Sequence, residues 1–348
     1  MNEVELAPLE AMAKEILRRC LADEDPAEIR RWIIETANRL GGGGDSNALM
    51  TWEESFDLTD QIIAEYERQA QIPVKDQKRL TFPWRSWNKL IDPLEPGMLA
   101  VVTAPDGLGK SIIAESVAEH WAKHKNKIAF VHYELSRNLM MLRRLARHTS
   151  ISVGAVKMGN LNAMEKSIIA EMRPALTAWD GCINYLHTPG WTVDRTLDEL
   201  RKLHAQDELD AVVLDYLEKI APSRRQLQMF GANAFQREAD NVEQIKNFAE
   251  STGVPVLMIA QMNKGGKKSE FENVDRTGIR GAGEKSDKSN LVIMMGRDRT
   301  ENGYSDRVHI LIDKNTMGPT GAFDMLMEPQ YFRMSDLDEY QPVIGATA

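Results

Sequence analysis

The chain has 348 residues, of which 43% are hydrophobic and 27% charged, enough for one large domain with a sizeable core and a smaller appendage. A formal net charge of −9 argues against a surface that coats nucleic acid, so any such contact must be local. Two distant cysteines, Cys20 and Cys182, make neither a disulfide framework nor a metal cluster and are typical of a reducing compartment. Without a signal peptide or an apolar run of ~20 residues, the sequence predicts a cytoplasmic protein with no membrane contact.

Residues 1–46 predict a helical hairpin followed by a glycine-rich linker. Apolar side chains recur at helical spacing over 9–20 and again over 29–40. Between them, the Asp-Pro-Ala-Glu sequence at 25–28 supplies a cap, a proline at the first helical position and a capping-box acid. Four consecutive glycines then end the second helix.

The linker region 47–80 predicts one further helix at about 53–70, ended by Pro73. Its broken apolar stripe needs a partner to pack against. That partner is either the following domain of the same chain or a neighbouring subunit.

From residue 81 to 348, strand and helix signals alternate, which predicts an α/β domain with a mainly parallel sheet covered on both faces. The last two strands have no helix between them and predict an antiparallel hairpin at the sheet edge. The expected strands are 98–103, 127–132, 182–187, 211–215, 254–260, 290–296, 307–313 and 321–327. The expected helices are 110–123, 136–148, 162–178, 192–205 and 235–252.

A phosphate-binding turn, the cradle, is predicted where the first of these strands meets the first of these helices, the cradle helix. Its residues are Ala104, Pro105, Asp106, Gly107, Leu108, Gly109, Lys110 and Ser111. Backbone N–H groups at a helix N-terminus bind anions, and the two glycines let the chain curl around a phosphate. Lys110 can reach the β- and γ-phosphates, and the Ser111 hydroxyl can bind Mg²⁺. The usual pattern starts with glycine where Ala104 stands, a small replacement; the alternative is a chance glycine turn.

Three more side chains at strand ends are expected at the same sheet edge. Asp215 ends an apolar strand and can bind Mg²⁺ through its water shell, although such a pattern is weak evidence alone. Glu134 follows the strand after the cradle helix, is expected beside the first strand, and can deprotonate the attacking water. It can also favour the dipole of a helix starting near Ser136. Gln261 can hydrogen-bond the γ-phosphate or the water, or it simply terminates its strand.

In this order and spacing, the cradle, Tyr-Glu134-Leu, Leu-Asp215-Tyr-Leu and Ala-Gln261-Met-Asn-Lys resemble the RecA-like ATPase domain of DnaB-family replicative helicases. The segment 279–290 and the strand after it are most similar to phage-type and Twinkle-type members. Residues 314–321 are similar to the family's Lys-x-Arg-x-Gly-Pro-x-Gly segment. The resemblance covers about residues 80–335, and residues 1–50 carry no matching signature.

The resemblance implies a homo-oligomeric ring, usually a hexamer, that binds ATP and Mg²⁺ between subunits and translocates on single-stranded DNA in a bacterial cell or a phage-infected host. One subunit would supply the cradle, Glu134, Asp215 and Gln261. Lys314 would reach the γ-phosphate of the neighbour's nucleotide. Residues 1–40 would be available to a replication partner.

The family's arginine finger is expected at position 316, where this chain has Thr316. Since a finger contributes a factor of ~10³ or more to turnover, brisk hydrolysis is in doubt. Arg297, Arg299 or Arg307 could substitute. Arg297 also matches the position at which family members stack a side chain on the nucleotide base.

Nucleic-acid contacts are expected in two loops that face the channel of such a ring. The first, about 223–236, contains Arg224 and Arg225. The second runs from 264 to 288 and has seven basic against five acidic residues, with Lys264, Lys267, Lys268 and Arg280 as the candidate ligands. Contacts to backbone phosphates would be sequence-tolerant and salt-sensitive. The alternative is a solvated flexible loop.

These patterns favour an ATP-dependent ring helicase. The alternatives are a RecA/KaiC-like ATPase that is not a helicase, and a nucleotide-dependent assembly switch with weak hydrolysis. The segment 314–321 favours the helicase, whereas Thr316 favours the alternatives.

Overall fold

The computed structural model describes residues 52–72, 79–178, 182–261, 288–301 and 303–337, together with scattered positions between 12 and 36. The chain divides into two compact units, Met1–Val74 and Lys75–Ala348. Most of the expected helical hairpin and the glycine-rich linker lie outside the described residues. No helix among the described residues is long and apolar enough to span a lipid bilayer.

The first unit contains the expected linker helix, α3 (Trp52–Ala70). Four of its apolar side chains, Phe56, Ile62, Ile63 and Tyr66, are exposed, with Phe56 67% and Ile63 49% accessible. The amphipathic pattern thus forms the expected helix.

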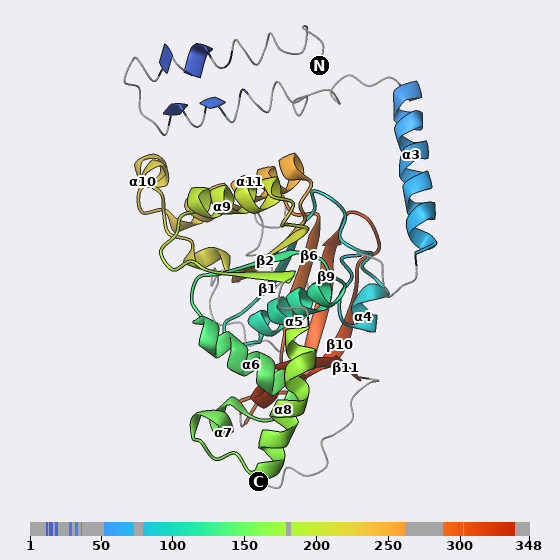
Figure 1. Ribbon diagram of the computed structural model, residues 1–348, viewed down its shortest axis with the longest axis vertical. Helices are drawn as coiled ribbons and strands as arrows, with labels where there is room; N and C mark the ends of the chain where they lie inside the picture. Colours follow the sequence, from blue (N-terminus) through green and yellow to red (C-terminus); the bar gives the residue numbers. More distant parts are fainter. Residues whose placement is uncertain are drawn as a thin grey trace. The chain divides into compact units, whose positions relative to one another are not determined.

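The second unit is built on a nine-stranded sheet in the order β11-β10-β9-β6-β1-β5-β4-β2-β3 (Figure 1). The strands from β6 to β3 in this order run parallel, and β9, β10 and β11 are antiparallel. The predicted α/β class with a mainly parallel sheet and an antiparallel edge is confirmed. The bounds are β1 Leu99–Ala104, β2 Ile128–His132, β3 Ile183–His187, β4 Ala211–Asp215, β5 Val256–Gln261, β6 Leu291–Gly296, β9 Arg307–Asn315, β10 Gly321–Glu328 and β11 Arg333–Asp336.

Helices cover both faces of this sheet, which is why its central strands are continuous apolar runs. One core cluster joins α5 and the segment 80–94 to one face, and a second joins α9 and α11 to the other. Figure 1 shows α5 and α6 together, away from α9 and α11. The bounds are α5 Lys110–Lys123, α6 Arg137–Thr149, α7 Val153–Lys157, α8 Ala163–Thr177, α9 Val193–Ala205 and α11 Ala234–Thr252.

Two expectations about local structure and strand order are wrong. Glu134 was expected beside the first strand, but β5 and β4 lie between β1 and β2. The apolar pattern of a strand does not encode which strand it pairs with. The expected loop at 223–236 instead begins with helix α10 (Arg224–Phe230), capped reciprocally by Ser223 and Gln226.

The two ends of the sheet-containing unit are joined by hydrogen bonds. The Trp84 indole donates to the carbonyl oxygen of Met334 at 2.8 Å, and the Arg85 backbone N–H donates to the Asp336 carboxylate at 2.8 Å. Trp87 is fully buried between the rings of Trp84 and Phe82, at centroid distances of 5.1 and 4.9 Å. These contacts stabilise α4 (Arg85–Asn88) against β11, the edge strand of the sheet.

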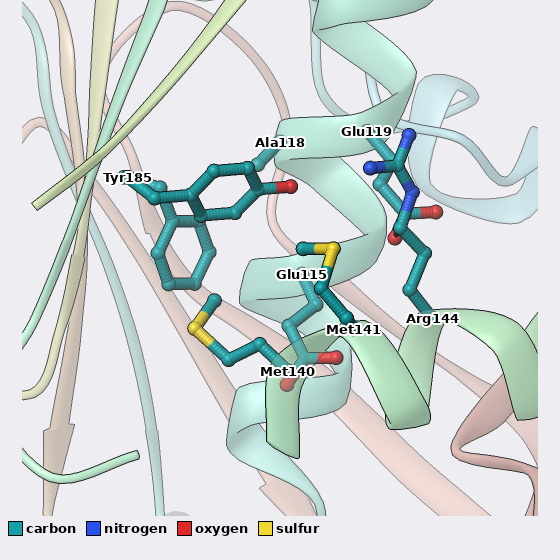
Figure 2. Close-up of a pocket in the computed structure, with 8 residues that line it drawn as sticks. Glu115, Ala118, Glu119, Met140, Met141, Arg144 and Tyr185 are labelled. Carbon is teal, nitrogen blue, oxygen red and sulfur yellow. Dashed lines mark ion pairs between the residues drawn. The ribbon is translucent and has the colours of Figure 1, made fainter. Parts of the chain in front are cut away.

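A buried ionic cluster holds α6 against α5. Arg147 Nη1 lies 2.6 Å from Glu119 Oε1, and Arg147 also pairs with Glu115. Arg143 Nη1 lies 3.2 Å from Glu115 Oε1. Figure 2 shows Glu119 beside Arg144, with Glu115 nearer Met140 and Met141, at a small crevice that all five residues line. Because α5 begins at the cradle and α6 begins just after Glu134, the cluster fixes the relative positions of these two parts of the candidate site.

Candidate nucleotide-binding site

The cradle is the turn between β1 and α5. Gly107 and Gly109 have φ angles of 78° and 96°, in the left-handed region that glycine adopts without strain. A Cβ atom on Gly109 would lie 2.3 Å from the Met327 Cε atom of β10. Gly109 is also the N-cap of α5, so the first free N–H groups of this helix face the turn. The backbone thus has the shape and polarity of an anion site.

Lys110 is buried, with 8% of its surface accessible, and its ammonium is directed back over the turn. Its Nζ donates to the carbonyl oxygens of Ala104 at 2.6 Å and Pro105 at 3.0 Å. Burial lowers the pKa of Lys110, and the nearby carboxylates of Asp106, Glu218 and Asp215 raise it. The ammonium is therefore held where it can reach an anion in the cradle.

Asp215 and Ser111 offer oxygen ligands next to this ammonium. Asp215 ends β4 and is buried; burial raises the pKa of its carboxyl, and the neighbouring Ser111 hydroxyl lowers it. Among the described residues, no group hydrogen-bonds its Oδ1 atom, a costly arrangement for a buried polar atom. An orphaned carboxylate oxygen beside a hydroxyl fits the oxygen chemistry that Mg²⁺ requires.

Burial raises the pKa of Asp215 to about 6, so its ionised form destabilises the metal-free fold at neutral pH. The folded state retains the Asp215 proton up to about pH 6 and the unfolded state only up to about pH 4, so the protonated carboxyl favours the folded state. This stabilisation is fully present below about pH 4 and is lost as the pH rises through about 6. In EDTA-containing buffer, we expect Asp215→Asn to be more stable than wild type by up to about 3 kcal/mol at pH 7.5. Urea denaturation at pH 4, 6 and 7.5 measures this difference. A difference that does not change with pH would contradict the expectation.

Glu134 lies two residues beyond β2, the strand that pairs with β4. It therefore lies at the same end of the parallel strands as Asp215. The Tyr133 backbone N–H donates to the Asp215 carbonyl at 3.2 Å, which brings the two strand ends together. The Glu134 carboxylate is exposed and lies 3.8 Å from Lys219 Nζ; burial and the nearby Glu134 carboxylate raise the pKa of the Tyr216 hydroxyl. Ser136, with its Oγ 3.4 Å from the Leu139 N–H, caps α6. The cap of α6 is thus a different residue from Glu134.

Gln261 is the last residue of β5 and is paired in register with Ala104 of β1. Its amide Nε2 donates to the Asp106 carboxylate, and its backbone N–H donates to Glu218 Oε1 at 2.8 Å. The side chain therefore contacts the cradle directly.

Lys314 lies at the opposite edge of the sheet. It pairs with Val292, near the start of β6, and thus lies at the end of the sheet where the parallel strands begin. The cradle follows Ala104 at the other end, where these strands finish; Ala104 comes one residue after Thr103, which pairs with Met294 of β6. The separation is roughly 10 Å along the strands and roughly 10 Å across two strands. Thr316, whose backbone N–H donates to the Asn290 carbonyl at 3.0 Å, follows at that same edge. Neither residue belongs to the cradle of its own chain.

Arg297 follows β6 on the cradle side. Its Nε donates to the Ser305 carbonyl at 2.6 Å, and its Nη1 lies 3.4 Å from the Sδ atom of Met327, the methionine that packs against Gly109. Its guanidinium also lies 5.8 Å from the Tyr304 ring, in the small hairpin of β7 (Arg299–Thr300) and β8 (Gly303–Tyr304). Arg299 lies over the same ring at 5.5 Å, and Arg307 pairs with Asp324.

The nucleic-acid candidates are only partly described. Arg224 is exposed on α10. Arg225 makes a two-pronged ion pair with Asp240 at 2.8 and 2.7 Å, which neutralises much of its charge. Lys264, Lys267, Lys268 and Arg280 fall within 262–287, outside the described residues.

Sequence reasoning assigned no individual role to Asp106, Tyr216 or Lys219, although each contacts a candidate catalytic side chain. The only sequence signal for Tyr216 and Asp106 was their position, directly after Asp215 and inside the cradle. Which side chains they contact could not be predicted, because those contacts depend on which strands are neighbours in the sheet.

Fold and site together define a family. The model of the DnaB-like helicase C-terminal domain matches residues 81–336, and the chain belongs to this family. It is 22% identical over 292 residues to the replicative DNA helicase DnaB of Leifsonia xyli subsp. xyli, covering 82% of this chain and 62% of that protein. It is 21% identical over 318 residues to the replicative DNA helicase DnaC of Bacillus subtilis, covering 90% and 66%. The chain thus spans a little under two thirds of these relatives.

Two solved structures share the fold. A DnaB-like replicative helicase, described with its interactions with primase, superposes with a TM-score of 0.73 at 12% identity over 96% of this chain and 76% of that one. A separately solved ATPase domain superposes with a TM-score of 0.67 at 14% identity over 80% of this chain and 98% of that one. The predicted RecA-like fold and DnaB-type family are confirmed, while the closer similarity to phage-type and Twinkle-type members stays a prediction.

Proposed function

We propose that this chain is the ATP-hydrolysing motor of a ring-shaped, hexameric DNA helicase that translocates on single-stranded DNA. The observation that carries the proposal is the convergence of Lys110, Asp215 and Gln261 at one sheet edge. Ser111 neighbours the Asp215 carboxyl, and Glu134 directly follows Tyr133, whose backbone N–H donates to the Asp215 carbonyl. The replicative DNA helicases among its relatives support the same function.

In this proposal, the N–H groups of the cradle and the Lys110 ammonium bind the β- and γ-phosphates of ATP. Ser111 and Asp215 would hold Mg²⁺, which would neutralise charge on the phosphate oxygens. Glu134 accepts the proton of the attacking water, and Gln261 orients that water or the γ-phosphate. Tyr216 and Lys219 lie beside the Glu134 carboxylate.

Lys314 acts on the nucleotide of a neighbouring subunit. Its position at the edge away from its own cradle supports an action in trans. A cation must contact the transferring phosphoryl group in order to stabilise it. Lys314 is too far from the cradle of its own chain to make that contact there. Thr316 brings no guanidinium to the interface, so we expect hydrolysis to be slow unless Arg297, Arg299 or Arg307 substitutes.

DNA would contact Arg224 of α10 and the segment 262–287, including Lys264, Lys267, Lys268 and Arg280. That segment directly follows Gln261, so the state of the γ-phosphate could be passed to the strand contacts. The exposed apolar stripe of α3 would pack on a neighbouring subunit. Residues 1–40 would bind a replication partner, in line with the primase interactions of one structural relative.

Strand displacement tests the helicase function. A labelled forked DNA should be separated with ATP and Mg²⁺ and should stay paired with a non-hydrolysable analogue. Separation that is equal with the analogue, or absent with ATP, would reject the motor.

Shared sites predict a complementation between inactive variants. We expect Lys314→Ala and Lys110→Ala each to lose most of their ATPase activity alone, because each lacks one half of every composite site. Mixing them before assembly should restore part of the activity, because an intact Lys314 from one subunit can meet an intact cradle of the other. An ATPase assay on the mixture measures this. A mixture no more active than its components would place Lys314 outside the site.

A second candidate, a nucleotide-dependent assembly switch with weak hydrolysis, is favoured by Thr316, which has no guanidinium to supply as an arginine finger. ATP turnover that single-stranded DNA stimulates supports the motor. Nucleotide binding without such turnover supports the switch.

A further inference from the structure

The Asp106 carboxylate lies between two side chains that we assign to the phosphates of ATP. One of its oxygens, Oδ1, is 3.7 Å from Lys110 Nζ. The other, Oδ2, accepts a hydrogen bond from Gln261 Nε2. The Asp106 carboxylate therefore contacts both the Lys110 ammonium and the Gln261 amide, the two groups that a γ-phosphate would bind.

The charge balance of the site explains this arrangement. Lys110 is buried, and its nearest hydrogen-bond acceptors are two neutral carbonyl groups of the turn. A buried ammonium needs a nearby anion, and the Asp106 carboxylate supplies one. A nucleotide phosphate would supply the same negative charge with stronger, multiple acceptors.

The Asp106 side chain is also able to leave. It is 61% exposed, so moving it into water loses little packing. It precedes Gly107, whose left-handed conformation has no heavy atom within 4 Å of the position where a Cβ would stand. By contrast, Lys110 and the end of β5 are fixed by buried neighbours. The exchange of partners therefore requires Asp106 to move and not the residues that bind it.

We propose that the Asp106 carboxylate is an internal competitor of the γ-phosphate. In the nucleotide-free site it pairs with Lys110 and Gln261; ATP displaces it; and it recaptures Gln261 once the γ-phosphate has been cleaved and released. This inference rests on the proposed nucleotide site and adds to it a residue that sets the affinity for triphosphate.

Competition of this kind affects triphosphates more than diphosphates. ADP has no γ-phosphate, so the contact between Asp106 and Gln261 survives when ADP binds. ATP must break that contact and must also overcome repulsion between the carboxylate and the γ-phosphate. Asp106 therefore lowers the affinity for ATP more than the affinity for ADP.

The test measures binding of fluorescent ADP and of a fluorescent non-hydrolysable ATP analogue to the full chain with Mg²⁺. Asp106→Asn removes the charge at nearly constant size. We expect its affinity for the triphosphate analogue to increase about fivefold to tenfold, and tenfold corresponds to about 1.4 kcal/mol. Its affinity for ADP should increase less, because the β-phosphate of ADP competes with Asp106 only for Lys110, and its KM for ATP should fall.

Two variants serve as controls. Asp92→Asn changes the net charge equally at an exposed position before β1, at the other edge of the sheet, and should bind as wild type does. Asp106→Glu keeps the competing charge and should not show the gain in triphosphate affinity. Thermal melting of each variant verifies that it is folded.

The outcomes separate this inference from the proposed function. If wild type and Asp106→Asn bind the triphosphate analogue equally, the competitor is rejected and the nucleotide site stands. If neither binds any nucleotide, both are rejected. Equal gains for ADP and the triphosphate analogue would also overturn the competitor, because they would reflect a general charge effect.

Discussion

Replacing Lys110 by alanine is expected to weaken ATP binding at least a hundredfold and to abolish measurable hydrolysis. The buried ammonium lies 3.7 Å from the Asp106 carboxylate and also acts on Asp215, so its loss would remove a positive charge from the candidate phosphate site. A hundredfold corresponds to about 2.7 kcal/mol, in the range of a charge-assisted hydrogen bond made in a buried setting. Titration with a fluorescent ATP analogue and a phosphate-release assay measure both effects.

Lys123→Ala is the matched control, since it removes the same charge from the other, exposed end of α5. It should keep wild-type affinity and turnover. Circular dichroism of Lys110→Ala should match that of wild type. If Lys110→Ala binds and hydrolyses ATP normally, the cradle assignment is wrong.

Replacing Glu134 by glutamine is expected to lower kcat by about 10² to 10⁴ while ATP affinity changes little, because the amide cannot accept the proton of the attacking water. The amide has nearly the same shape and can keep its place beside the Tyr216 hydroxyl. Single-turnover hydrolysis, compared with equilibrium binding of an ATP analogue, separates the two quantities.

Glu171→Gln, an exposed change on α8, controls for the loss of one negative charge. A kcat of Glu134→Gln within a few-fold of wild type would require another base. Glu218, whose carboxylate accepts from the Gln261 backbone N–H, is then the next carboxylate to replace.

Local pattern was sufficient to locate eight strands and the five long helices among the described residues of the sheet-containing unit, but not the short elements α4, α7, α10, β7 and β8. The apolar run that predicts 211–215 is β4 itself, and the helix expected at 110–123 has the observed ends, Lys110 and Lys123. These bounds follow from short-range signals: apolar runs for buried strands, and the glycine that begins α5. The edge strand β11 was not predicted, because its four residues alternate buried and half-buried positions in a segment with no strong apolar run.

The site was predictable in membership but less so in arrangement. Cradle, carboxylates and Gln261 each end a strand, and parallel strands bring such ends to one edge. Local pattern could not tell that β4 and β5 separate β2 from β1, so Glu134 was expected beside the wrong strand. For the same reason, the contact between Asp106 and Gln261, residues 155 positions apart, could not be foreseen.

The joining of the two ends of the sheet-containing unit limits how the protein can be dissected. A fragment that starts after Asn88 would remove the indoles of Trp84 and Trp87, and one that stops before Met334 would remove the acceptors of Trp84 and Arg85. A fragment that stops before Met327 would in addition lose the side chain that packs against Gly109 in the cradle. The smallest piece expected to fold and bind nucleotide therefore includes Trp84 near one end and Asp336 near the other.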